Sequence, residues 1–206
     1  MMDPPFTAIA NFVADFGEFV ALAPAAVAVG VFLALGRRRS FALAWSIGMG
    51  FAVLAVALFK AQGLPVSGHA AMAMSFEGGL AVLMWRDGLG LGAGSRVAAI
   101  ILALLSIMVF ASVALLRWHS WQDLAVGSSL GFVTPLGLAL VREQTARAWR
   151  VRGLGPVAAT IVVVLIGAFH GMRLDPHTER RVALDLERAL LGISAAAARP
   201  IANVSP

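Results

Sequence analysis

Long apolar stretches separated by short polar segments run through most of the chain. Six of these stretches have roughly the length that a helix needs to cross a hydrocarbon core of about 30 Å, because each helical residue adds about 1.5 Å. The predicted spans are residues 19–36, 41–59, 70–85, 97–116, 124–141 and 154–172. This pattern predicts an all-α integral membrane protein built as a six-helix bundle.

The segments that flank the spans have a different pattern. Residues 4–18 mix apolar and polar positions, with phenylalanines at helical spacing, which indicates an amphipathic helix in the membrane interface. In the tail, residues 173–206, four apolar side chains are expected on one helical face: Val182, Leu186, Leu190 and Ile193. We therefore expect a membrane domain over residues 1–172, followed by an amphipathic tail.

Composition and charge agree with a membrane protein and exclude other classes. Hydrophobic residues make up 60% of the chain and charged residues only 13%, whereas about a quarter of a soluble domain is charged. The net charge is +5, but the arginines cluster between apolar runs, where they act as topology determinants rather than as a nucleic-acid surface. The chain has no cysteine, which excludes disulfides and thiolate metal sites.

The basic residues also predict an orientation. Nine of the 16 lie in the loops after the first, third and fifth predicted spans: Arg37, Arg38, Arg39, Arg86, Arg96, Arg142, Arg147, Arg150 and Arg152. By the positive-inside rule these loops face the cytoplasm. The other loops, which carry two histidines, then face outward. Arginine in place of lysine, with abundant alanine and glycine, indicates a bacterial source. We therefore expect an inner-membrane protein whose histidine loops lie on the periplasmic face.

The two outward loops carry the polar side chains best suited to chemistry. His119 and Asp123 stand four residues apart, so on a helix they would share a face and the carboxylate would orient the imidazole. The other outward loop, which comes earlier in the chain, ends in Ser67-Gly68-His69, also beside an apolar run. Helix packing would bring the two loops together. A zinc site is disfavoured, because the two histidines have only Asp123 as a third ligand and lie among cations.

Cations and small donors around the two histidines favour an anionic ligand. Lys60 is the only lysine among the 16 basic residues, which points to a need for a compact positive charge. Gly68 allows a ligand to approach the backbone, and the helix expected to begin near His69 would offer free N–H groups. These features suit a phosphoryl group.

The two histidine segments resemble motifs of the type 2 phosphatidic acid phosphatase (PAP2) superfamily, membrane lipid phosphatases related in fold to vanadium haloperoxidases. Val66-Ser67-Gly68-His69 resembles the Pro-Ser-Gly-His motif of that family. Ser112, His119 and Asp123 are similar in spacing to its motif of Ser-Arg, His and Asp. The resemblance implies a PAP2-like bundle that acts on a lipid phosphate or diphosphate and uses no metal or cofactor.

The cationic positions of the family are matched only in part. Lys60 resembles the lysine of the first motif, but no Arg-Pro follows it. The arginine of the third motif falls on Val113. Arg117 is four residues further on, so a continuing helix would place it one turn along the same face, where it could take over the missing charge.

The resemblance also implies a mechanism. His119 would attack phosphorus and form a phosphohistidine, with Asp123 holding its far nitrogen, while His69 would protonate the leaving lipid oxygen and later activate water. Five residues would hold the phosphoryl oxygens: Lys60, Ser67, Gly68, Ser112 and Arg117.

Two alternatives remain open from the sequence. Without the two family arginines, the chain could be an inactive relative that binds a lipid head group or a membrane partner. Glu77 lies inside the third predicted span, where a carboxylate is costly, so it is a partner of Arg117 or His69, a helix-packing residue, or the intramembrane charge of a small transporter. His170 and His177 lie outside both loops and are expected to be structural.

Overall fold

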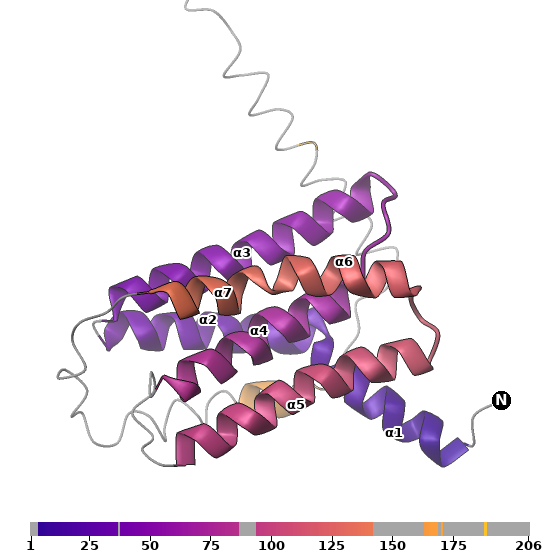
Figure 1. Cartoon of the computed structure of the whole chain (residues 1–206), viewed down its shortest axis with the longest axis horizontal. Coiled ribbons are helices and arrows are strands. Elements are labelled where there is room, and N and C mark those ends of the chain that lie inside the picture. Colours follow the sequence, from indigo (N-terminus) through magenta and orange to yellow (C-terminus); the bar gives the residue numbers. More distant parts are fainter. Residues whose placement is uncertain are drawn as a thin grey trace, which may run out of the picture.

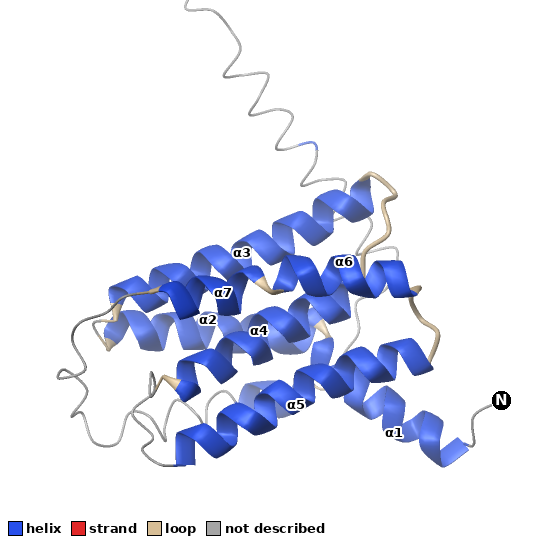
Figure 2. Ribbon diagram, in the orientation of Figure 1, coloured by secondary structure: helices blue, strands red, loops and turns tan. Residues whose placement is uncertain are grey.

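A computed structural model of the 206-residue chain describes residues 4–36, 38–86, 94–141, 163–168, 170 and 188, and the structural statements below concern these residues. Every regular element among them is a helix (Figures 1 and 2). The elements are α1 (Pro4–Ala14), the 3-10 turn η1 (Asp15–Gly17), α2 (Phe19–Leu35), α3 (Arg39–Ala61), α4 (Gly68–Trp85), α5 (Gly94–Leu115), α6 (Trp121–Gly131) and α7 (Val133–Leu140). The all-α prediction is therefore confirmed.

The first five predicted spans each coincide with helix to within a few residues. The fifth is divided into α6 and α7, which meet at Phe132 and continue in nearly the same direction (Figure 1). The sixth predicted span, 154–172, lies largely outside the described residues, although 163–168 are helical. The predicted tail, 173–206, lies outside them apart from Arg188.

The apolar character of the described helices is compatible with an integral membrane protein. Among them, α3, α5 and the joined α6–α7 are long and apolar enough to cross a membrane. The segment α1–η1 and α2 would make a fourth span, bent by 40° at the break before α2. On α1 the side chains of Phe6, Ile9 and Phe12 are exposed, as expected for an amphipathic helix in an apolar interface.

Helix α4 lies at the centre of the bundle and contacts α2, α3, α5, α6, α7 and η1. Alanine and glycine occupy much of its surface, which allows the surrounding helices to come close. At the end away from the α3–α4 loop, Arg86 Nη1 donates to the carbonyl oxygen of Leu138 at 2.7 Å and ties α4 to α7. Trp45 packs on Phe76 and donates from Nε1 to the carbonyl oxygen of Ala26 at 2.9 Å, which joins α3 to both α4 and α2.

The seam between α4 and α6 is a very close approach of two helices. A Cβ atom on Gly127 would overlap the backbone oxygen of Ser67, and one on Gly131 would overlap that of Ala71. These two glycines stand four residues apart and face α4 one turn after another, so they form a small-residue contact surface. The seam is possible only without side chains at both positions.

Two hydrogen bonds close this seam. The backbone N–H of Ser67 donates to the carbonyl oxygen of Asp123 at 2.9 Å, and the hydroxyl of Ser75 donates to the carbonyl oxygen of Gly131 at 3.0 Å. One bond lies at the start of α6 and the other at its end. The first turn of α4 is therefore fixed against the first turn of α6.

We predict that Gly131→Ala lowers the free energy of unfolding by about 1–3 kcal/mol, because the new methyl group must push α6 away from α4. The measurement is chemical denaturation in detergent micelles. Gly137→Ala in α7 is the matched control, since nothing lies within 4 Å of a Cβ placed there. It should leave stability unchanged or raise it by up to about 1 kcal/mol. Equal effects of the two substitutions would contradict the close seam.

Candidate functional site

Three interruptions of the helices meet at one end of the bundle. They are the loop between α3 and α4, the loop between α5 and α6, and the break between η1 and α2 (Figure 1). The α3–α4 loop is joined to the first turn of α6 by the backbone bond from Ser67 to Asp123. Polar side chains that are far apart in the sequence therefore come together where the apolar helices end.

The structure brings the two predicted histidines together. The ring centroids of His69, in the first turn of α4, and His119, in the α5–α6 loop, are 6.1 Å apart. The indole of Trp118 also packs beside His69, with the ring centroids 5.4 Å apart. Both histidines are partly exposed, so a ligand can reach them. The two rings are therefore neighbours and can act on one group bound beside them.

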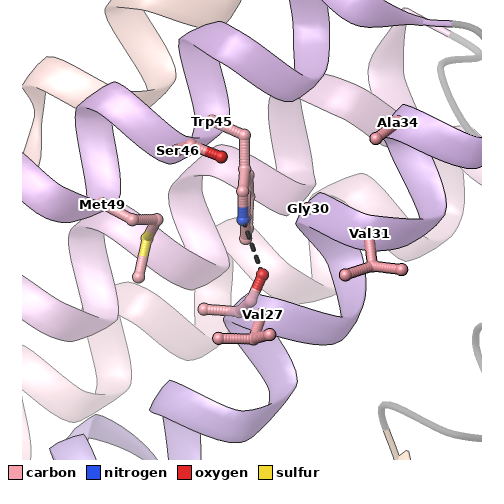
Figure 3. A pocket seen from close by; sticks show the side chains of 8 residues that line it. Val27, Gly30, Val31, Ala34, Trp45, Ser46 and Met49 are labelled. Atoms are coloured by element: carbon pink, nitrogen blue, oxygen red, sulfur yellow. Dashed lines mark hydrogen bonds between the residues drawn. The ribbon is translucent and has the colours of Figure 1, made fainter.

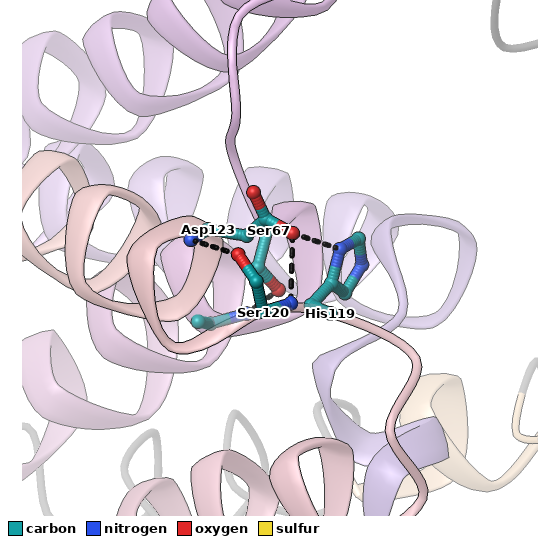
Figure 4. Close-up of polar contacts among 5 residues, drawn as sticks. Ser67, His119, Ser120 and Asp123 are labelled. Carbon is teal, nitrogen blue, oxygen red and sulfur yellow. Dashed lines mark hydrogen bonds and ion pairs between the residues drawn. The ribbon is translucent and has the colours of Figure 1, made fainter.

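His119 contacts Asp123, although for a different reason from the predicted one. His119 precedes the N-cap residue of α6, Ser120, so the expectation that the two share a helical face was wrong. A capping box turns the carboxylate back instead: Ser120 N–H donates to Asp123 Oδ2 at 2.9 Å, and Asp123 N–H donates to Ser120 Oγ at 3.2 Å (Figure 4). His119 Nδ1 lies 3.5 Å from the same Oδ2 atom.

This contact assigns the roles of the two nitrogens of His119. An ionised carboxylate only accepts hydrogen bonds, so Nδ1 carries the proton in the neutral ring and Nε2 has the lone pair. Partial burial lowers the pKa of His119 below its ordinary value, the neighbouring His69 and Lys60 lower it further, and Asp123 opposes them. His119 is therefore neutral at pH 7, which is the state a nucleophile requires.

The cation of the site comes from the last turn of α3 and lies beside the N-terminus of α4. The Nζ atom of Lys60 lies 3.7 Å from the position that a Cβ of Gly68 would take, so the ammonium group is next to the first turn of α4. Ser67 is the N-cap, and its buried Oγ accepts from Ala70 N–H at 3.3 Å. The hydroxyl of Ser67 thus holds the helix start, while Lys60 and the free N–H groups of the first turn favour an anion.

Glu18 belongs to this site, and the sequence reasoning missed it. Its Oε1 atom lies 2.9 Å from Nε2 of His69, and the residue is only 7% exposed. The sequence pattern places Glu18 only as the last residue of the predicted interfacial helix, 4–18. A carboxylate directly after glycine, at the point where an apolar span begins, is the only signal in the sequence that could have pointed to it.

Arg117 is not where the sequence predicted it. Helix α5 ends at Leu115, and Arg117 has a left-handed backbone (φ 54°), so the helical face of Val113 does not continue to Arg117 as expected. The bonds from Trp118 N–H to the carbonyl oxygen of Val113 (3.3 Å) and from Arg117 N–H to that of Ala114 (3.1 Å) form a Schellman turn. Arginine occupies the position that glycine usually takes, and its side chain is exposed.

Two further predicted residues lie within helices. Ser112 is buried in α5, and no contact described for the chain joins it to the two histidines. Glu77 is 2% exposed in α4, and neither of its carboxylate oxygens has a hydrogen-bond partner among the described residues. The expected pairing of Glu77 with His69 or Arg117 is not found there, since His69 contacts Glu18 instead.

The described residues form no metal site, and their apolar groove lies apart from the histidines. The described part of the chain has no group of three histidine or carboxylate residues placed to hold a metal ion. An apolar groove of about 440 Å³ lies between α2 and α3, with the indole of Trp45 along it (Figure 3). It is lined by Ala26, Val27, Gly30, Val31, Ala34, Trp45, Ser46 and Met49, and therefore by none of the polar residues above.

The comparisons with known proteins identify no relative. No protein-family model, no curated protein and no solved structure matches the chain. The geometry of the site therefore carries the functional argument.

We predict that Lys60→Gln raises the pKa of His119, because loss of the positive charge removes one cause that disfavours the imidazolium. Lys60→Arg keeps the charge and should leave the pKa close to that of the wild type. The pKa is measured by NMR titration of ¹⁵N-histidine-labelled protein in micelles, with the His119 signal assigned by its loss in His119→Ala. An unchanged pKa in Lys60→Gln would show that the ammonium group is not near the ring.

Proposed function

We propose that the protein is a membrane lipid phosphatase that transfers a phosphoryl group from a lipid to His119 and then to water. The observation that carries this proposal is the pair of histidine rings with centroids 6.1 Å apart, together with the ammonium group of Lys60 next to the N-terminus of α4. A carboxylate lies at one nitrogen of each ring. A nucleophile, a proton donor and an anion-binding group are the parts that phosphoryl transfer requires.

The first step forms the phosphohistidine. The lone pair of His119 Nε2 attacks phosphorus, the bond from phosphorus to the lipid oxygen breaks, and protonated His69 gives its proton to that oxygen. Asp123 stabilises the positive charge that develops on the His119 ring. Lys60 and the N–H groups of the α4 first turn stabilise the charge on the phosphoryl oxygens.

The second step returns His119 to its starting state. His69, now neutral, accepts a proton from water, the water oxygen attacks phosphorus, and the bond from phosphorus to His119 breaks. A phosphomonoester then yields inorganic phosphate and a lipid alcohol, whereas a diphosphate yields inorganic phosphate and a lipid monophosphate. Polyprenyl diphosphates, phosphatidyl lipids and lipid A type lipids are the substrate classes that we propose.

The resemblance to the PAP2 superfamily supports the same proposal. In this interpretation the helices complete a six-span PAP2-like bundle of a bacterial inner membrane, with the site on the periplasmic face. Lys60 provides the main positive charge. Arg117, two residues before the nucleophile and exposed at the same end of the bundle, remains a predicted second cation.

Two observations favour other functions. Val113, which stands where the family has an arginine, is fully buried in an apolar cluster, and this favours an inactive relative that binds a lipid head group. The buried carboxylate of Glu77, which has no hydrogen-bond partner among the described residues, favours a small transporter. The three proposals differ in what His119→Ala should abolish.

We predict that purified wild-type protein releases phosphate from at least one member of a lipid phosphate panel, with chelator present, and that His119→Ala abolishes the release. Phosphate is measured in micelles for each lipid. Correctly folded His119→Ala with wild-type release would exclude His119 as the nucleophile. If the wild type releases no phosphate from any lipid, the inactive relative is favoured. In a separate variant, Arg117→Ala, an unchanged rate of phosphate release would show that Arg117 is not part of the site.

A further inference from the structure

Glu18 is a buried carboxylate that the mechanism above does not use. The Glu18 side chain is 8% exposed, and its Oε1 atom lies 2.9 Å from Nε2 of His69, whose side chain is 18% exposed. An ionised carboxylate is costly to bury without a hydrogen-bond donor, and a charge-assisted bond of this length is among the strong ones. The contact joins residues 51 positions apart in the chain, one at the break between η1 and α2 and the other in the first turn of α4.

The fold holds Glu18 at this place from both sides. The N–H of Glu18 donates to the carbonyl oxygen of Asp15 at 3.1 Å, and the carbonyl oxygen of Glu18 accepts from Leu22 N–H at 3.0 Å. Glu18 itself is extended (φ −70°, ψ 131°), so it breaks the helical path between η1 and α2. The break is what turns the side chain of Glu18 toward α4.

Gly17 allows this break to approach the histidine. A Cβ atom on Gly17 would lie 2.8 Å from Cγ1 of Val109 and 2.9 Å from the carbonyl oxygen of His69. Any side chain would therefore push the turn away from α4. The backbone of the His69 residue and its ring are thus both contacted by the η1–α2 break.

The contact selects which nitrogen of His69 can exchange a proton with a substrate. Since the carboxylate accepts, Nε2 carries a hydrogen that is directed to Glu18, and Nδ1 is the nitrogen that remains for the substrate. His119 has the opposite arrangement, with Nδ1 toward Asp123 and Nε2 available. The two rings therefore have different nitrogens left for a bound group.

We infer that Glu18 is a positioning residue, which orients the ring of His69 so that Nδ1 gives its proton to the leaving lipid oxygen. This inference rests on the proposed phosphatase function. In the step itself, the proton on Nδ1 moves to the oxygen as the bond from phosphorus to that oxygen breaks. His69 is left neutral with its Nε2 hydrogen still bound to Glu18.

The test compares leaving groups that differ in their need for a proton. Glu18→Ala should lower kcat for an alkyl lipid phosphate by about 100-fold, the size expected for loss of general acid catalysis. The burst of nitrophenol from p-nitrophenyl phosphate measures the first step alone and should change little, because nitrophenolate leaves without protonation. Glu18→Gln, which keeps an accepting oxygen of the same reach, should recover part of the lipid activity. Asp15→Asn, which removes a carboxylate from the same turn, is the control and should behave as wild type.

A second readout does not depend on activity. In ¹⁵N-histidine-labelled protein, neutral His69 should carry its hydrogen on Nε2 in the wild type and in Glu18→Gln, and should populate the other tautomer in Glu18→Ala. The tautomer of His119 should stay the same in all three proteins. The His69 signal is assigned by its loss in His69→Asn.

The outcomes separate the two proposals. The inference is supported if Glu18→Ala lowers kcat for the alkyl lipid phosphate but not the nitrophenol burst, and if the His69 tautomer changes in the same variant. Equal loss of activity with both leaving groups overturns it, because Glu18 then acts only on the fold. An unchanged His69 tautomer in Glu18→Ala also overturns it, because Glu18 then does not hold the ring. If the wild type releases no phosphate and the tautomer still changes, the phosphatase proposal and the catalytic role fall, while the pairing of Glu18 with His69 stands.

Discussion

The close backbone contact between α4 and α6 is the constraint on which the site depends. Gly127 and Gly131 let α6 lie directly on the carbonyl groups of Ser67 and Ala71, and the bond from Ser67 N–H to Asp123 fixes the start of both helices. A hydrogen bond between backbones is worth most where water is excluded, and Ser67 is fully buried. The histidines project from the two segments that this contact joins, so their separation follows from it.

The electrostatic arrangement at that end gives the two histidines different surroundings. His119 is kept neutral by partial burial and by nearby positive charge, with Asp123 fixing its tautomer. His69 has a buried carboxylate at hydrogen-bond distance. Two similar side chains in different surroundings can act as nucleophile and proton donor at the same pH, which is a common way for a site to combine both roles.

The sequence predicted the features that depend on local pattern. Apolar stretches of spanning length gave helices close to their predicted bounds, and the polar residues at the ends of two spans pointed to the loops that meet. Other features depend on contacts between distant segments or on backbone conformations that a residue rarely adopts. In the sequence, Glu18 looked like one polar residue of an amphipathic helix, because only tertiary packing places it against His69. The left-handed turn at Arg117 was not predicted, because arginine stands there instead of the glycine that usually marks such a turn.

The formation of a phosphohistidine at His119 is the central claim, and trapping the intermediate tests it most directly. Wild-type protein is mixed with a lipid carrying labelled phosphate, quenched within one turnover, and digested to locate the label. The account predicts protein-bound phosphate that survives alkali, is lost in acid and lies on the peptide that contains His119. Label on another residue, or phosphate release without any protein-bound label during the first turnover, would contradict it.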